Sequence, residues 1–170
     1  MIVIRDETDS DYEAVHRVNE LAFDRPEEAN LVESLRDAVT GLISLVAVSD
    51  HDVIGHILFS PVTVKGAHSD FQAIALGPMA VLPEHQRTGI GSQLVRNGLD
   101  RCVRAGENIV FVVGHPRFYP RFGFVPARPL GFECEYSVPD DVFMVAELEE
   151  GALAGLSGMV RYHPAFNQFD

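Results

Sequence analysis

Cysteine and long apolar runs are both scarce in this 170-residue chain. Cys102 and Cys134 are too few for a disulfide framework, and no apolar stretch reaches the length of a membrane span. Residues 1–7 lack the basic and apolar segments of a signal peptide. We therefore expect a cytoplasmic protein that does not enter a membrane. Because no Cys/His cluster has the spacing of a metal site, no metal is implied.

Basic residues are also few, and their placement is uneven. Thirteen Lys and Arg stand against 25 Asp and Glu, and the net charge of −12 argues against a nucleic-acid partner. Residues 84–128 are the exception, with seven Arg and three acids. A polyanionic ligand would be drawn to this basic segment, and a cationic amine to acidic runs such as 6–11 and 140–141.

Length and composition predict one globular domain over residues 1–170. Hydrophobic periodicity predicts strands over 2–5, 42–48, 53–64, 71–83 and 107–113, and helices over 8–23, 27–39 and 89–105. The strands on either side of the turn at 49–52 should form an antiparallel hairpin. The strand at 107–113 should run parallel to the one before it, across a right-handed helical crossover.

The segment 83–92 joins a buried strand to an amphipathic helix through Gly89 and Gly91. A helix that begins here exposes unpaired main-chain N–H groups at its positive end, which makes an anion site. A Cβ at either glycine would obstruct the close approach of a phosphate. The spacing matches neither a nucleotide P-loop nor a dinucleotide fingerprint. Gly-x-Gly alone also fits a turn that merely starts a helix.

Two motifs resemble one family. Residues 86–91, Gln-Arg-Thr-Gly-Ile-Gly, resemble the Q/R-x-x-G-x-G/A pyrophosphate loop of the GNAT superfamily, the acyl-CoA-dependent N-acetyltransferases. Residues 114–124, Gly-His-Pro-Arg-Phe-Tyr-Pro-Arg-Phe-Gly-Phe, are close to the G-x-P-x-Y/F-Y-x-x-F-G-F pattern of a bacterial GNAT subgroup, the YhbS-like proteins. The resemblance covers residues 2–147, and residues 148–170 match more loosely.

The resemblance implies a fold and a cofactor site. The fold is a mixed α+β single domain whose central sheet has about seven strands and is flanked by about four helices. Its N-terminal part is antiparallel, and its parallel central strand pair is splayed. The cofactor is acetyl-CoA. The residues that the resemblance assigns to its pyrophosphate are Gln86, Arg87, Thr88, Gly89, Ile90, Gly91 and Ser92.

One strand carries a proline that supports this picture. Pro78 cannot donate to a strand ladder, so the strand should bulge at Gly77 and Pro78. In the GNAT family the equivalent strand splays from its neighbour, and the pantetheine arm of coenzyme A pairs with its backbone. The resemblance carries that role to Met79, Ala80 and Val81.

The implied reaction transfers an acetyl group from acetyl-CoA to a primary amine by direct attack in a ternary complex. It needs an unprotonated amine, a polarised thioester carbonyl and a proton for the leaving thiolate. The resemblance places Tyr119 as the general acid, the Val81 N–H at the carbonyl and Phe118 beside the cofactor. A phenol with a pKa of ~10 stays protonated at neutral pH and can donate. Packing in an aromatic cluster is the alternative role of Tyr119.

The general base is not determined by the sequence. Residues 72–82 contain no Asp, Glu or His, whereas some relatives carry a glutamate on this strand. His115 is the leading candidate because imidazole titrates near neutrality, and capping of a turn is its alternative role. His56 and Asp70 are further candidates that would act through water, and His85 is expected near phosphate.

Two other functions fit the same motifs. A non-catalytic acyl-CoA-binding sensor or interaction module would explain the missing strand carboxylate, and a nucleotide-binding protein is the weaker alternative. The acidic segments favour a cationic acceptor without choosing among a protein N-terminus, lysine, polyamine, aminoglycoside or amino acid. Acyl chain length, biological pathway and oligomeric state are open, and the C-terminal segment or a sheet edge is the candidate surface for a homodimer.

Overall fold

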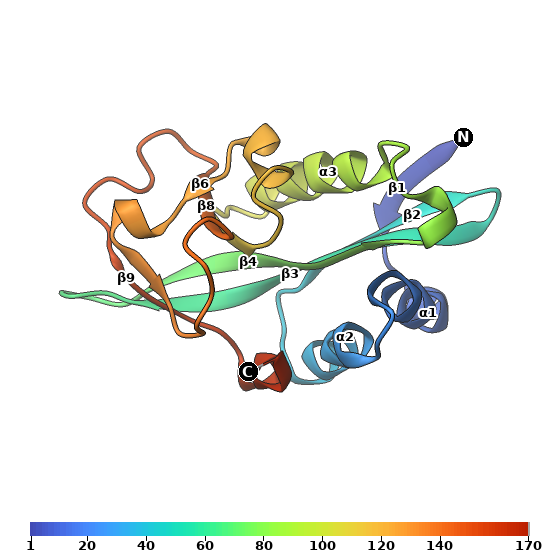
Figure 1. The fold of residues 1–170 in the computed structure, drawn as a ribbon, viewed down its shortest axis with the longest axis horizontal. Coiled ribbons are helices and arrows are strands. Elements are labelled where there is room, and N and C mark those ends of the chain that lie inside the picture. Colours follow the sequence, from blue (N-terminus) through green and yellow to red (C-terminus); the bar gives the residue numbers. More distant parts are fainter. Residues whose placement is uncertain (170) are drawn as a thin grey trace.

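The computed structural model describes residues 1–169, in which one mixed sheet lies between two layers of helices (Figure 1). The strands are β1 (Ile2–Asp6), β2 (Ile43–Ser49), β3 (Asp52–Lys65), β4 (Phe71–Val81), β5 (Ile109–Val113), β6 (Val125–Pro126), β7 (Phe132–Cys134), β8 (Phe143–Glu147) and β9 (Gly158–Arg161). The mixed α+β fold predicted from the sequence is confirmed. The sheet has nine strands where the resemblance implies about seven, and the four strands that follow β5 lie beyond those predicted from hydrophobic period.

The helices cover both faces of the sheet. The α-helices are α1 (Tyr12–Phe23), α2 (Glu27–Ala38) and α3 (Ile90–Arg104). Shorter 3-10 segments are η1 (Asp9–Asp11), η2 (Pro83–His85), η3 (Tyr119–Phe122), η4 (Arg128–Leu130) and η5 (Pro164–Phe169). Helices α1 and α2 lie on one face with η5 beside α2, and α3 lies on the other face (Figure 1). None of the described helices combines the length and apolar character that a membrane crossing needs.

Strand order follows the predicted pairing. The order is β1-β2-β3-β4-β5-β8-β6, and β9 lies beside both β3 and β7. Strands β1 to β4 pair antiparallel, so the predicted hairpin at 42–64 is confirmed. Strands β4 and β5 pair in parallel, with α3 in the connection between them, and this predicted crossover is confirmed as well.

Strand β4 bulges where the sequence predicts. The register of β3 against β4 shifts between Ile57 and Phe59, so that Gly77 and Pro78 together lie opposite a single residue of β3. Pro78 has no N–H for a ladder, and the φ angle of +150° at Gly77 is one that other residues rarely adopt. The bulge bends the end of β4 that follows Pro78, residues 79–81, away from the regular sheet.

Apolar side chains of β3 point alternately to the two faces of the sheet and contribute to the core on both. Ile57 and Phe59 are fully buried in the cluster that includes Leu94 of α3. Leu58, between them, belongs to the cluster that includes Leu35 of α2. Because successive side chains of a strand point to opposite faces, this strand supplies apolar contacts to both helical layers. The two layers are thereby held in place around the splayed end of β4.

Candidate active site

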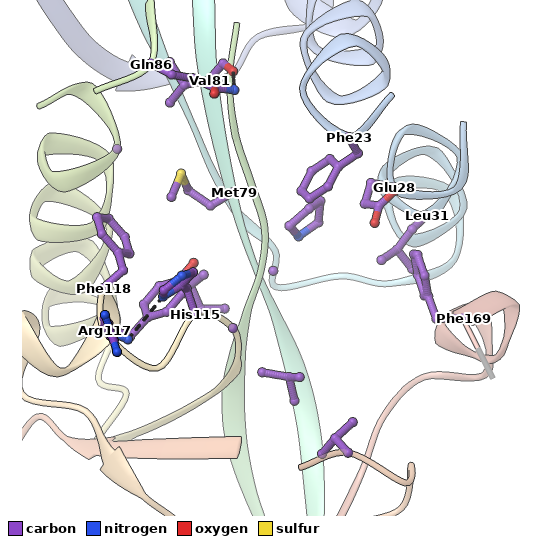
Figure 2. A pocket seen from close by; sticks show the side chains of 18 of the residues that line it. Phe23, Glu28, Leu31, Met79, Val81, Gln86, His115, Arg117, Phe118 and Phe169 are labelled. Atoms are coloured by element: carbon purple, nitrogen blue, oxygen red, sulfur yellow. Dashed lines mark hydrogen bonds between the residues drawn. The ribbon is translucent and has the colours of Figure 1, made fainter. Parts of the chain in front are cut away.

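A cleft of about 1210 Å³ runs from the N-terminus of α3, past the end of β4 at residues 76–81, to α1, α2 and η5. Common ligand pockets hold about 300–1,000 Å³, so the cleft has room for more than one small molecule. Figure 2 shows Met79 and Phe118 on the α3 side of the strands and Phe23, Leu31 and Phe169 on the opposite side. We refer to these two parts as the loop end and the aromatic end of the cleft.

The loop end contains a gap between two strands. Parallel pairing of β4 with β5 ends at Leu76 and Val112. Beyond that point, no strand of the described chain pairs with residues 77–81 on that side. Both edges of the gap, including Met79 and Gly114, line the cleft. The structure therefore contains the splayed parallel pair that the sequence predicts.

Main-chain groups of β4 face this gap in alternation. The Leu82 N–H donates to the Ile54 carbonyl at 2.9 Å, so this residue pair is hydrogen-bonded. Antiparallel ladders alternate, and Ala80 therefore also turns its main-chain groups toward β3. Met79 and Val81 direct theirs away from β3, into the gap. Of the three β4 residues assigned to the pantetheine arm, these two are placed to pair with a ligand.

The loop before α3 presents unpaired amides. Within residues 1–169, the main-chain N–H groups of residues 87–92 have no hydrogen-bond acceptor. The first bond of the helix runs from the Gln93 N–H to the Gly89 carbonyl at 3.1 Å, and Gly89 itself has a φ angle of +88°. The Gln86 side chain donates to the Val81 carbonyl at 2.9 Å and ties the loop to β4. The positive end of the helix is thus open toward the cleft.

Tyr119 stands at the inner wall of the loop end. Its side chain is 7% exposed and lines the cleft. The ring packs edge-on against Phe118 and Phe124, with centroid distances of 5.0 and 5.7 Å, and a Cβ at Gly114 would collide with it. Burial raises the pKa of the phenol above its usual value, so the hydroxyl stays protonated at neutral pH. The residue takes part in aromatic packing and also faces the cleft.

His115 lies at the exposed rim of the cleft (Figure 2). Its Nδ1 accepts a hydrogen bond from the Arg117 N–H at 3.2 Å. In the neutral ring this contact places the proton on Nε2. The Phe118 N–H donates to the His115 carbonyl at 3.1 Å, so the histidine also stabilises the turn. The contact expected of a turn-capping histidine is therefore present.

The two alternative bases lie elsewhere. His56 is fully buried, with Nδ1 3.1 Å from the Asn19 amide nitrogen and Nε2 2.8 Å from the Ser44 hydroxyl. Burial lowers the pKa of His56 to about 3, so the ring is neutral. Asp70 forms an ion pair with Lys65 at 3.0 Å. Neither residue lines the cleft. The prediction that they act through water is wrong, because strand pairing places one in the core and the other at a hairpin end.

Three residues assigned to the cofactor do not themselves line the cleft: Ala80, Thr88 and Ile90. The Thr88 hydroxyl donates to the His85 carbonyl at 2.6 Å and closes the turn before α3. Ile90 is 4% exposed and packs in the core. His85 does line the cleft, as expected for a residue near phosphate. Thr88 and Ile90 can therefore contribute main-chain amides, while their side chains hold the loop in shape.

Charge in the cleft differs from charge on the surface. The acidic runs 6–11 and 140–141 do not line the cleft, and Asp6 and Asp140 form ion pairs with arginines at 2.8 Å. Glu28 is the one carboxylate among the described residues that line it. The arginines that line the cleft are Arg25, Arg87, Arg117 and Arg121. The acids named from the sequence therefore do not surround the reaction site, whereas the basic segment does.

From the sequence, the resemblance places the helices at 8–23 and 27–39 beside the acceptor entrance, but the aromatic lining of this end of the cleft was not predicted. Its lining includes Phe23, Arg25, Glu28, Leu31, Tyr136, Val138, Tyr162, Phe166 and Phe169. Glu28 is 7% exposed, and its Oε1 accepts from the Arg25 Nε at 2.9 Å. The Arg-Pro break after α1 marks a loop, and the aromatic residues of the tail suggest packing. Neither signal shows that these segments meet.

An open parallel strand pair, an unpaired helix N-terminus and a buried tyrosine thus meet in one cleft. This combination defines the class of acyl-CoA-dependent acyltransferases that the sequence motifs suggest. The family model for the acetyltransferase (GNAT) domain matches residues 3–127. The chain belongs to the GNAT family of N-acetyltransferases.

Known relatives are similar to this protein in sequence and structure over nearly the whole chain. The sequence is 36% identical over 169 residues to "Uncharacterized N-acetyltransferase YhbS" of Escherichia coli K12, covering 99% of this chain and all of the relative. A crystal structure of Escherichia coli YhbS in complex with CoA matches with a TM-score of 0.92 at 35% identity, covering 99% of this chain and 93% of the other. The predicted resemblance to the YhbS-like subgroup is confirmed.

A second solved structure extends the comparison to another organism. A GNAT family acetyltransferase from Brucella melitensis, in complex with acetyl-CoA, matches with a TM-score of 0.79 at 32% identity, covering 98% of each chain. Two similar proteins have thus been crystallised with coenzyme A or its acetyl thioester.

Proposed function

We propose that this protein transfers an acetyl group from acetyl-CoA to a primary amine by direct attack in a ternary complex. The observation that carries the proposal is the gap beside Met79 and Val81, which leads to the unpaired amides of residues 87–92 within one cleft. The complexes of two similar proteins with CoA and acetyl-CoA support it. The volume of the cleft supports simultaneous binding of two substrates.

The cofactor would bind along the loop end. The amides of residues 87–92 would hold the diphosphate, helped by Gln86, which braces the loop, and by the charge of Arg87. Main-chain groups of Met79 would pair with the pantetheine arm as a further strand would, and the Val81 N–H would remain for the thioester carbonyl. Phe118, which lines the cleft beside Gly91, would cover the arm.

The chemical step would proceed between the two ends of the cleft. The neutral amine attacks the thioester carbonyl, a C–N bond forms and the C–S bond breaks. The Val81 N–H, directed into the gap, would polarise the carbonyl oxygen. Tyr119 would donate its phenolic proton to the departing thiolate as the general acid. Burial keeps that proton on the phenol until negative charge develops on sulfur. The proton that the nitrogen loses as the amide forms would return to the Tyr119 phenolate, directly or through water.

His115 is the residue that we propose to take the proton of the ammonium group. Its Nδ1 is held by the Arg117 N–H in this structure, so the base role requires that this 3.2 Å contact open when the acceptor binds. A water molecule would then connect the amine to Nδ1. If substitution of His115 by Asn left the acidic limb of the kcat/KM profile in place, the acceptor amine would be deprotonated by another route.

The compartment, the metal requirement and the assembly that we propose are those expected from the sequence. We propose a cytoplasmic enzyme that needs no metal ion, and a homodimer is the assembly we would test first. Residues 1–169 contain no group of three or more His, Cys, Asp and Glu that could hold a metal. Addition of EDTA should leave turnover unchanged, and light scattering would give the mass in solution.

Thiol release tests the proposal. Acetyl-CoA is incubated with a panel of primary amines, free CoA is followed with a thiol reagent, and products are identified by mass. Amine-dependent release with an acetylated product supports the enzyme. Tight calorimetric binding of acetyl-CoA without release for any amine would instead support the non-catalytic binding module. Displacement of CoA by ATP would favour a nucleotide-binding protein.

A further inference from the structure

Aromatic side chains from three separate segments form the aromatic end of the cleft. Phe23 ends α1, while Tyr162 packs against Tyr136 and Phe166 with centroid distances of 5.6 and 5.1 Å. The Tyr136 hydroxyl donates to the Asn167 side-chain oxygen at 2.8 Å and fastens η5 to the sheet. These contacts join the segments of Tyr136 and Tyr162 and η5 into one wall, and Phe23 of α1 adds to this wall because it lines the same end of the cleft.

Two members of this wall are exposed although they are large and apolar. Phe23 is 36% and Phe169 is 39% exposed, and both line the cleft. Figure 2 shows Phe23 at the end of α1 and Phe169 next to Leu31, with Glu28 and Leu31 between the two rings in this view. Leu31 itself is 2% exposed and forms an apolar floor. Apolar surface left open within a concave site marks a place where an apolar ligand group binds.

Charge at this end is already balanced within the protein. The Glu28 carboxylate accepts from the Arg25 Nε with both oxygens, at 2.9 and 3.2 Å. The Arg25 guanidinium also lies 5.5 Å from the centre of the Phe169 ring. The rest of the cleft adds arginines and no further carboxylate among the described residues. The described lining of this end therefore has no unpaired carboxylate for the further charges of a polycation, whereas a ligand with one amine does not need several carboxylates.

We propose that the acceptor is a monoamine attached to an aromatic ring or to an apolar group of similar size. The ring packs between Phe23 and Phe169 over Leu31, and the amine points along the cleft toward the gap beside β4. This assignment rests on the proposed acetyltransferase function and specifies the acceptor class for the same cleft. It disfavours polyamines and aminoglycosides, which the surface charge alone would admit.

Binding without turnover tests the assignment. The protein is saturated with CoA, and 2-phenylethylamine or spermidine is titrated by calorimetry. We expect 2-phenylethylamine to bind at least about tenfold more tightly than spermidine. Substituting Phe23→Ala or Phe169→Ala should weaken 2-phenylethylamine about 2- to 10-fold, the range for loss of one aromatic contact, and leave the acetyl-CoA affinity unchanged.

Leu21→Ala is the matched control, because Leu21 lies on α1, is 43% exposed and does not line the cleft. It should leave both affinities within twofold of wild type. Equal or tighter binding of spermidine, or unchanged affinity in both Phe variants, would overturn the acceptor assignment. Acetylation of spermidine in preference to 2-phenylethylamine would overturn it while the acetyltransferase function stood. Binding of 2-phenylethylamine with no thiol release for any amine of the panel would overturn the acetyltransferase function and leave the aromatic end as a binding site for the amine.

Discussion

Gly89 and Gly106 stand at the two ends of α3 and form a natural matched pair. Their φ angles are +88° and +87°, and a Cβ at either would meet nothing within 4 Å. Substitution by Ala places a side chain in the left-handed region, which costs about 1–2 kcal/mol. Gly89→Ala and Gly106→Ala should therefore lower the free energy of unfolding by similar amounts, without a steric clash in either case.

Only Gly89 lies among the unpaired amides that line the cleft. A Cβ there would stand beside the N–H groups of residues 90–92 and hold a phosphate away from them. Loss of one hydrogen bond to a charged group costs about 1.5–3 kcal/mol, so the Kd for acetyl-CoA should rise about 10- to 100-fold in Gly89→Ala. Gly89→Glu should weaken binding further, because it adds negative charge at the anion site.

Two measurements separate folding from binding in this pair. Urea unfolding monitored by circular dichroism gives the stability of each variant, and calorimetric titration gives the Kd for acetyl-CoA. We expect equal stability losses and a loss of affinity in the Gly89 variants alone. If Gly89→Ala bound acetyl-CoA as tightly as Gly106→Ala, the assignment of residues 87–92 to the diphosphate would be refuted.

Three further predictions follow from the same structure. Tyr119→Phe should lower kcat at least about 100-fold with little change in the Kd for acetyl-CoA, and normal turnover would remove the general-acid role. The pKa of His56 is about 3 in the folded state against 6.5 unfolded, so the unfolded state binds more protons between these values and stability falls with acid in that window. His56 alone should lower the free energy of unfolding by about 2 kcal/mol between pH 7 and pH 5, and His56→Gln should flatten that dependence in urea titrations at both pH values. Gly98→Ala should destabilise by about 1–3 kcal/mol despite the higher helix propensity of Ala, because a Cβ there would come within 2.6 Å of the buried Phe59 ring, and unchanged stability would mean that the ring can move.

Features that depend on a short stretch of chain could be predicted from the sequence. The bulge at Gly77 and Pro78 follows from the missing proline N–H, and the open amides of residues 87–92 follow from a helix that begins after Gly89. The strands and helices at the centre of the fold follow from hydrophobic period, and observed ends differ from predicted ones by a few residues at most. Such features are local, because backbone conformation and hydrogen-bonding capacity belong to neighbouring residues.

Other features of the site depend on contacts between segments that are distant in the sequence. His56 has the chemistry of a base, yet pairing of β3 with β2 and β4 buries it beside Asn19. The acidic runs lie outside the cleft, where Asp6 and Asp140 pair with arginines, and the described lining has four arginines and one carboxylate. Composition gives the total charge but not which charges face a ligand, since that depends on which surfaces the fold brings together.

The sequence by itself determined the kind of enzyme, because the strand, the glycine loop and the helix that we propose to bind an acylated cofactor are contiguous in residues 71–104. The tertiary structure alone decided which residues line the other half of the cleft. Phe23 and Glu28 lie in the first 30 residues and Phe169 near the other end of the chain, and they line one cleft only because η5 packs beside α2 on one face of the sheet. No local pattern encodes that meeting, since it results from the burial of apolar surface between distant segments.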